Sequence, residues 1–227
     1  MRIFLYVISM LVSSHMLAQS DEIVHVNWQS EWYDQPFELH TPYKTSDNFQ
    51  IEFDQLKMYV SEFRLLDNDK IVWAENSSFH LLDFGDPSTT NWTWSIPTNI
   101  DYNKIQFTFG IDSLTQVSGV QGGPLDPTTG MYWTWQTGYI NFKLEGKSDQ
   151  CPSRLNQFQL HIGGYAFPHN TSRLITHAVN DKQKLNFIIP CNKLIDAWDL
   201  TTEHHIMSPG ESADRCAEIL YNIITTR

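Results

Sequence analysis

Hydrophobic and polar residues alternate with a period of two over most of this chain, which is the pattern of half-buried β-strands. Glycine, proline, asparagine and aspartate separate the alternating stretches and indicate turns. The predicted strands are 23–26, 49–53, 56–66, 71–73, 78–84, 104–111, 132–144, 155–163, 174–179 and 184–189. Their number and spacing predict an all-β fold, an antiparallel β-sandwich of the Ig-like or jelly-roll-like kind.

Two pairs of these strands are expected to form hairpins. Strand 56–66 is expected to turn through 67–69 and pair with 71–73. Strand 174–179 is expected to turn at Asn180-Asp181 and pair with 184–189.

Near the C-terminus the period changes to three and four residues, which indicates a helix. Its apolar stripe consists of Ala213, Cys216, Ala217, Leu220, Ile223 and Ile224. Ser208 is the predicted N-cap, Pro209 the first helical residue, and Glu211 completes a capping box. The stripe is expected to pack across the sandwich, and a shorter helix is predicted at 192–198.

The longest alternating strand, 132–144, follows a loop rich in glycine and proline at 120–130. The alternation places Trp133 and Trp135 on one face of it. Two indoles on one face need a large apolar partner surface or a ligand, and the pattern leaves both open.

The first 18 residues have the pattern of a cleaved signal peptide. Arg2 precedes an apolar run at 3–12, and Ala18 offers a small residue for cleavage before Gln19. The run is too short for a transmembrane helix, and no cysteine at the cleavage site would carry a lipid. We therefore expect one β-domain at 19–227, in a periplasmic or secreted protein.

The 227-residue chain has a formal net charge of −11, which argues against binding to nucleic acids or anionic membranes. Three cysteines in an oxidising compartment make one disulfide the expectation. Cys151 and Cys191 each adjoin a proline at a strand edge, so we favour that pair, with Cys216 buried and free. The odd count leaves other pairings open.

The segment PLDPTTGMYWTWQTGYINFKLEG, at 124–146, resembles the block that marks the MbnP family of methanobactin-partner-like periplasmic copper-binding proteins. Weaker matching blocks occur in the family's order. They are LKMYVSEFRLL at 56–66, FHLLD at 79–83, FTFGI at 107–111, FQLHIGG at 158–164 and HIMSPG at 205–210.

The resemblance implies an exported, non-catalytic protein that binds copper for scavenging, storage or delivery. When the family's ligand positions are matched to the blocks of this sequence, the implied metal ligands are His161 first, then His205, His80 and Met207. Imidazole and thioether groups are ligands that copper accepts. The block after FTFGI reads DSLTQVSG and lacks the histidine that many members carry there. That departure leaves open a weaker site, a three-ligand site of different composition, or none.

The resemblance also implies that Trp133 or Trp135 lies beside the metal and is oxidised to kynurenine by a partner, a dihaem peroxidase of the MauG type. An electron-rich indole could also stabilise a copper cation through its π face. Plain core or rim aromatics remain the other interpretation of both residues.

Enzymatic functions are not indicated, because the chain has no nucleophile elbow, zinc-protease motif or phosphate-binding loop. The main alternative is a carbohydrate-binding or adhesion module that stacks sugar rings on tryptophans. Its candidates are Trp92, Trp94, Trp133 and Trp135. That alternative predicts exposed, coplanar indoles, whereas copper binding predicts histidine and methionine side chains close to Trp133 or Trp135.

Overall fold

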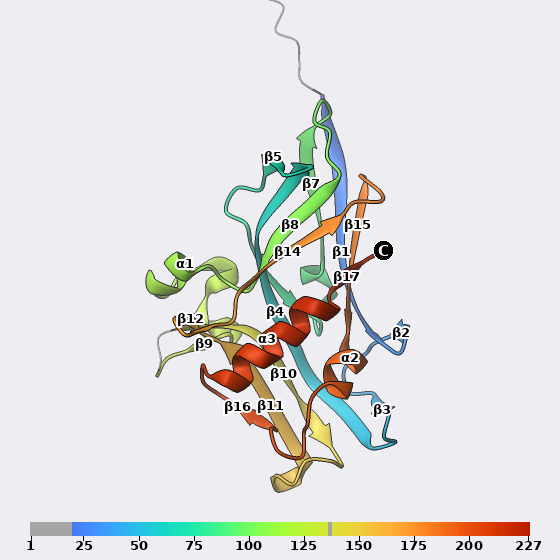
Figure 1. Cartoon of the computed structure of the whole chain (residues 1–227), viewed down its shortest axis with the longest axis vertical. Coiled ribbons are helices and arrows are strands. Elements are labelled where there is room, and N and C mark those ends of the chain that lie inside the picture. Colours follow the sequence, from blue (N-terminus) through green and yellow to red (C-terminus); the bar gives the residue numbers. More distant parts are fainter. Residues whose placement is uncertain (1–19, 136–137) are drawn as a thin grey trace, which may run out of the picture.

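Two large β-sheets and a C-terminal helix dominate the computed structural model, which describes residues 20–135 and 138–227 (Figure 1). The predicted β-sandwich with a C-terminal helix is confirmed. The predicted signal peptide 1–18 lies outside the described residues, as do Gln19, Gln136 and Thr137.

The ten-stranded sheet is organised around its longest strand, β4 (Gln50–Asp67). Along one edge β4 pairs with β10 (Gly138–Ser148) and then with β8 (Lys104–Phe109). The other edge carries β3 (Pro42–Lys44), β6 (Phe79–Asp83) and β5 (Lys70–Ala74). The pairing of β4 with β5 confirms the first predicted hairpin.

Further strands extend this sheet beyond β10 and β8. β11 (Gln157–Gly163) pairs with β10, and β16 (His205–Ile206) pairs with β11 in parallel. β14 (Arg173–Ala178) pairs with β8.

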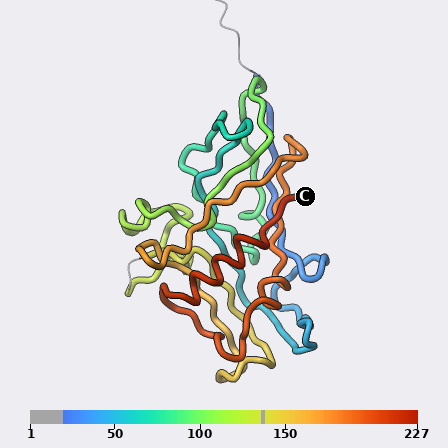
Figure 2. The backbone as a smooth tube through the Cα atoms, viewed as in Figure 1, coloured from blue at the N-terminus to red at the C-terminus, as the bar shows by residue number. Residues whose placement is uncertain are grey.

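The five-stranded sheet is built on β1 (Asp21–Trp32), which pairs with β15 (Lys184–Pro190) in parallel and with β7 (Asn91–Pro97) in antiparallel. β2 (Gln35–Pro36) and β17 (Thr225–Thr226) complete it. In Figure 2 the orange segment of β15 runs beside the blue β1, although they are far apart in sequence.

The second predicted hairpin is therefore wrong, because β14 and β15 belong to different sheets. The segment between them crosses from one sheet to the other. Val179 N–H donates to Asn103 at its start, and Gln183 C=O accepts from His25 at its end. Both strands bury their apolar side chains against other partners, and this burial outweighs the local turn signal.

The core between the sheets is aromatic. Trp28 of β1 stacks on Phe187 of β15 at 4.4 Å between ring centroids, and Phe107 of β8 meets both rings edge-on. α3 (Glu211–Ile223) contacts β11, β14 and β15, and so covers the core where the two sheets diverge (Figure 1). Its buried residues are Ala213, Cys216, Ala217 and Leu220, which confirms the predicted stripe.

The predicted start of α3 is wrong by two residues. The N-cap is Gly210 rather than Ser208, and glycine has no side chain that could cap the helix. Pro209 lies outside the helix and packs against Gly164, so a tertiary contact keeps the segment before α3 extended. The shorter predicted helix is present as α2 (Cys191–Asp196).

The predicted disulfide is also wrong, because Cys151, Cys191 and Cys216 are all free and buried. Cys151 follows β10 of one sheet, whereas Cys191 follows β15 of the other. Burial raises the pKa of the Cys151 thiol to about 11 and that of Cys216 to about 12, and it also raises that of Cys191. The three thiols act as small apolar core groups.

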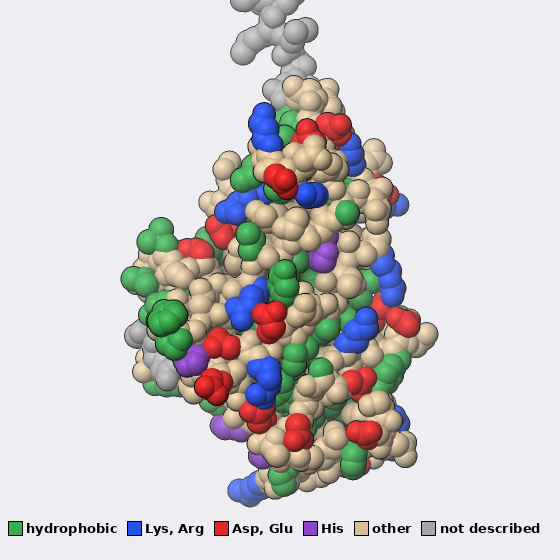
Figure 3. Space-filling view, viewed as in Figure 1, with side chains coloured by type: hydrophobic (Ala, Val, Ile, Leu, Met, Phe, Trp, Pro, Cys, Tyr) green, Lys and Arg blue, Asp and Glu red, His purple; other side chains and the backbone are tan. Residues whose placement is uncertain are grey.

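The remaining elements are short. They are α1 (Ser113–Val117), β9 (Tyr132–Trp133), β12 (Tyr165–Ala166), β13 (His169–Asn170) and 3₁₀ turns at Pro87–Thr89, Gly123–Leu125, Pro127–Thr129 and Arg154–Asn156. α1 carries exposed hydrophobic side chains, visible at the left of Figure 3. Among the described helices, none has the length and apolar character needed to cross a bilayer.

Candidate functional site

The two faces of the ten-stranded sheet differ in composition. The core face, which packs toward the other sheet and α3, carries Leu56, Met58, Phe142, Leu144, Leu160 and Ile162. The opposite face, called the outer face below, carries the residues in between, which include Lys57, Lys143, Glu145 and His161. A second hydrophobic cluster covers part of the outer face and is formed by Tyr59, Ile111, Leu125, Met131, Trp133, Tyr139 and Ile140.

His161 lies on the outer face of β11, directly opposite Lys143 of β10. Its side chain is only 6% exposed, although its strand neighbours Gln157 and Gln159 on the same face are more open. Its burial at this position separates it from an ordinary surface histidine.

Glu145 of β10 fixes the orientation of the His161 ring. Nε2 of His161 lies 2.7 Å from Oε1 of Glu145, and because an ionised carboxylate only accepts hydrogen bonds, Nε2 carries the proton. This hydrogen bond is the main cause that lowers the pKa of Glu145, and the nearby ammonium of Lys143, 3.4 Å from the same oxygen, adds to it. The carboxylate is therefore ionised at neutral pH.

The other ring nitrogen of His161, Nδ1, is buried and has no hydrogen-bond partner within the described residues. A buried polar atom without a partner is costly and is rare in folded proteins. In the neutral ring with its proton on Nε2, Nδ1 offers a lone pair. A carboxylate on one imidazole nitrogen and an open lone pair on the other is the arrangement of histidines that ligate metals.

The segment that contains His205 and Met207 runs alongside β11. His205 pairs with Gln159 and Ile206 with Leu160 in parallel register, and Met207 follows this paired stretch directly, as His161 does on β11. The segment continues along β11, because a Cβ at Gly164 would lie 3.0 Å from Pro209. Ile206 faces the core, so His205 and Met207 share the outer face with His161.

Trp133 lies on the same face, next to His161. A Cβ at Gly163, two residues beyond His161, would come within 2.7 Å of the Trp133 ring. Trp133 is buried, and its Nε1–H has no partner within the described residues. Trp133 and Met207 thus lie along the same strand, β11, as His161.

The prediction of one continuous strand through both tryptophans is wrong. β9 ends at Trp133, a turn follows, and β10 begins at Gly138 and pairs back with β9. Trp135 lies in the turn and is 61% exposed, and its ring centroid lies 6.3 Å from that of Trp133 at an interplanar angle of 41°. The alternation hid the turn because Thr134 and Gly138 fit a strand as well as a hairpin.

His80 does not belong to this site. It lies on β6, across β4 from β10 and β11, opposite Val60 of the core face. Its ring stacks on Trp92 at 4.1 Å and donates from Nε2 to the Glu75 carboxylate at 2.9 Å. Its pairing opposite Val60 puts it on the core face, whereas His161 is on the outer face, so the structure does not bring these two predicted ligands together.

Glu75 instead joins three groups into a structural network. It accepts hydrogen bonds from the His80 ring, from the Ser78 hydroxyl and from the Trp94 indole. Burial alone would raise the pKa of Glu75, but these hydrogen bonds and the charge on His80 outweigh burial and lower the pKa.

We expect Glu75→Gln to lower the free energy of unfolding at pH 7 by about 1–2 kcal/mol, because the charged acceptor is lost. A carboxylate whose pKa is lowered by folding stabilises the protein above its unfolded pKa and loses this contribution as pH falls through the folded pKa. The difference in the free energy of unfolding between the variant and the parent should therefore shrink below about pH 4.5. Urea unfolding at a series of pH values measures it. Glu38→Gln, at an exposed carboxylate, is the control, and a deficit that stays constant with pH would contradict this account.

Comparison with known proteins identifies the family. The family model MbnP matches residues 22–208. The chain belongs to the MbnP family. It is similar in fold to the solved structure of MbnP from Methylosinus trichosporium, with a TM-score of 0.61 and 17% identity over 80% of each chain. No curated protein matches the chain. Membership in the MbnP family indicates a methanobactin-related, copper-associated protein.

The tryptophans lack the arrangement that sugar binding by stacking requires. Trp94 and Trp133 are buried, Trp92 is half-buried against His80, and Trp92 and Trp94 lie at 67° to each other. Trp135 alone among these four is well exposed. They form no row of exposed, coplanar indoles, so the alternative carbohydrate-binding function has no support in their geometry.

Glu145 is the important residue that the sequence did not single out. Its position two residues after Lys143 is an ordinary alternating polar position. Only the pairing of β10 with β11 sets it next to His161, since Glu145 is opposite Gln159 and one diagonal step away from His161.

Proposed function

We propose that this MbnP-family protein is an exported, non-catalytic copper-binding protein that holds one copper ion for scavenging, storage or delivery. The observation that carries the proposal is the buried, unpartnered Nδ1 of His161, whose ring is held from the other side by Glu145. His161 is the principal ligand, Met207 a thioether ligand beside it, and His205 a third candidate on the same face.

The chemistry of this ligand set favours Cu(I). A thioether and neutral imidazoles are soft or borderline ligands that suit Cu(I), and carboxylate-preferring ions such as Mg²⁺ and Ca²⁺ gain little from them. The burial of His161 and the neighbouring Trp133 ring exclude water from one side of the ion, which would protect Cu(I) from oxidation. The indole face of Trp133 is available for a cation–π contact.

Copper analysis of the purified mature protein tests the proposal. After loading with Cu(I) under reducing, anaerobic conditions and desalting, the protein should retain one copper per chain. A protein that retains no copper but binds an immobilised glycan would overturn the proposal in favour of the carbohydrate-binding alternative.

Glu145→Gln is expected to weaken Cu(I) binding by about 10- to 100-fold, as loss of an outer-shell partner of a ligating histidine does. The amide no longer stabilises the proton on Nε2, so the tautomer that exposes Nδ1 is less favoured. Competition with a chromophoric Cu(I) chelator measures the change. Glu38→Gln, at an exposed carboxylate outside both clusters, is the control, and equal affinities of both variants would contradict the assigned role.

A partner of the MauG type, a dihaem peroxidase, is part of the proposal, with kynurenine formed from Trp133 or Trp135 as the product. Trp135 is the indole that such a partner can touch, and Trp133 is the one beside His161. Peptide mass mapping of protein from the native host tests both residues. An unmodified pair of tryptophans in copper-loaded native protein would remove the oxidation from the proposal and leave copper binding intact.

A further inference from the structure

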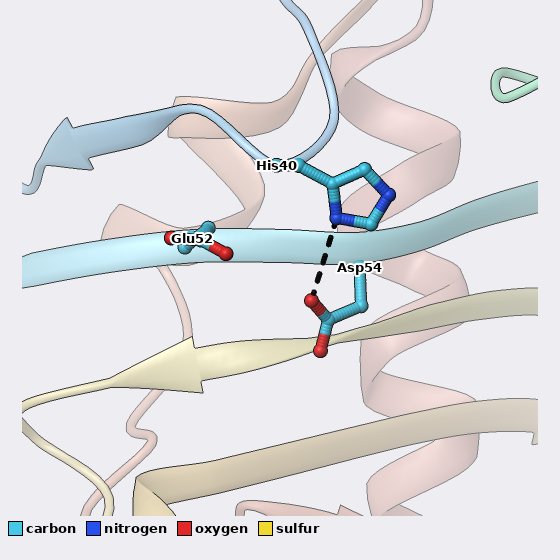
Figure 4. A group of neighbouring side chains, drawn as sticks. All are labelled: His40, Glu52 and Asp54. Atoms are coloured by element: carbon cyan, nitrogen blue, oxygen red, sulfur yellow. Dashed lines mark ion pairs between the residues drawn. The ribbon is translucent and has the colours of Figure 1, made fainter.

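A second cluster of possible metal ligands lies apart from His161, at His40, Glu52 and Asp54. Their ligand atoms, one imidazole nitrogen and one oxygen from each carboxylate, all lie within 4.8 Å of one another. Figure 4 shows the His40 ring reaching over β4 toward the Asp54 carboxylate, with Glu52 further along the same strand. No other group of three His, Cys, Asp or Glu side chains within the described residues is this close.

The backbone holds the three side chains at this spacing. The N–H of His40 donates to the carbonyl of Phe53, which stands between the two acidic residues on β4. Asp54 is the extra residue of a β-bulge, because Phe53 pairs with Gly146 and Gln55 with Glu145. Glu52 and Asp54 are two residues apart and lie on one side of β4, because Phe53 between them is buried on the other.

The polar atoms of this cluster are poorly satisfied by contacts within the protein. Nδ1 of His40 lies 3.7 Å from Oδ1 of Asp54, which is too long for a hydrogen bond. Two ligands about 2.1 Å from one tetrahedral zinc ion stand about 3.4 Å apart, so the observed separation is close to that of a shared ion. Within the described residues, no hydrogen bond from the protein reaches either carboxylate, and Lys147, opposite Glu52 on β10, forms no ion pair with it.

We propose that His40, Glu52 and Asp54 form a second metal site, for a borderline divalent ion such as Zn²⁺ or Cu²⁺. One imidazole and two carboxylates suit these ions, whereas Cu(I) prefers the softer set at His161 and Met207. The His40 side chain is 69% exposed, so the site is open and keeps water among its ligands. The two sites share no residue.

Zinc binding by the mature His161→Ala protein tests this proposal, because that background removes the first site. Zn²⁺ has no redox chemistry, so affinity is measured cleanly by competition with a chromophoric chelator, at about 0.15 M salt to screen diffuse attraction. His40→Asn, Glu52→Gln and Asp54→Asn should each weaken zinc binding at least about tenfold. Asparagine is chosen at position 40 because His40 has φ of +59°, which asparagine tolerates.

Matched controls separate the site from general surface effects. His25→Asn removes an exposed imidazole from β1, and Asp47→Asn removes an exposed carboxylate outside the cluster. Both should bind zinc as the parent does, and circular dichroism and thermal unfolding of all variants confirm folding. The proposal is overturned if His40→Asn binds zinc as tightly as the parent, or if Asp47→Asn loses as much affinity as Asp54→Asn.

Discussion

Replacement of His161 by alanine is expected to lower the affinity for Cu(I) by at least about 100-fold, since removal of a ligand should cost no less than removal of its outer-shell partner. The change deletes a buried imidazole whose Nδ1 has no partner within the described residues, and it leaves the Glu145 carboxylate without its imidazole donor. Chelator competition on the mature protein measures the affinity.

His177 provides the matched control for that change. It is a half-buried histidine of β14 whose Nε2 also lacks a partner, but the rings of Phe107 and Phe187 surround it and no carboxylate orients it. Burial lowers the pKa of His177. His177→Ala should therefore keep full Cu(I) affinity. His161→Gln retains a hydrogen-bond donor for Glu145 while it removes the imidazole. It therefore tests the ligand even if the alanine variant fails to fold. Unchanged Cu(I) affinity in both His161 variants would remove this residue from the site.

Substitution of Gly163 by alanine is expected to lower the free energy of unfolding by about 1–3 kcal/mol, the usual cost of overpacking. Its Cβ would lie 2.7 Å from the Trp133 ring and 2.7 Å from the backbone carbonyl of Tyr139. The carbonyl belongs to the neighbouring strand β10 and cannot move away, so Trp133 must shift. Because Trp133 adjoins His161, Cu(I) affinity should fall in the same variant.

Gly122→Ala is the control for the Gly163 variant. No atom lies within 4 Å of a Cβ at Gly122, and its φ of −100° suits alanine. Its free energy of unfolding should stay the same or rise slightly, because alanine reduces the entropy of the unfolded chain. Urea denaturation compares both variants with the parent. A Gly163→Ala protein as stable as the parent would show that Trp133 does not pack closely against β11.

The alternation of the sequence was sufficient to predict most of the strands and the apolar stripe of α3. It was insufficient where the partner of a strand is distant in sequence. β14 and β15 look like a hairpin because they are adjacent in the chain, yet burial against β8 and β1 places them in different sheets. The same limit applies to Cys151 and Cys191, whose burial in the core needs no covalent link.

The candidate site was predictable in part. The family resemblance led to His161, Met207 and Trp133, and the structure places the latter two along the strand that carries His161. It also led to His80, whose pairing opposite Val60 places it on the core face. Glu145 and the cluster at His40 were not predictable, because each depends on strand register or on a bulge that no local pattern encodes.

X-ray absorption at the copper edge tests the central claim most directly, because it reports which atoms surround the ion in the Cu(I)-loaded mature protein. The account predicts imidazole nitrogen together with one sulfur at about 2.3 Å, with loss of the sulfur signal in Met207→Leu and a weakened imidazole signal in His161→Ala. A spectrum without sulfur that is identical in the parent and both variants would contradict a copper site beside His161.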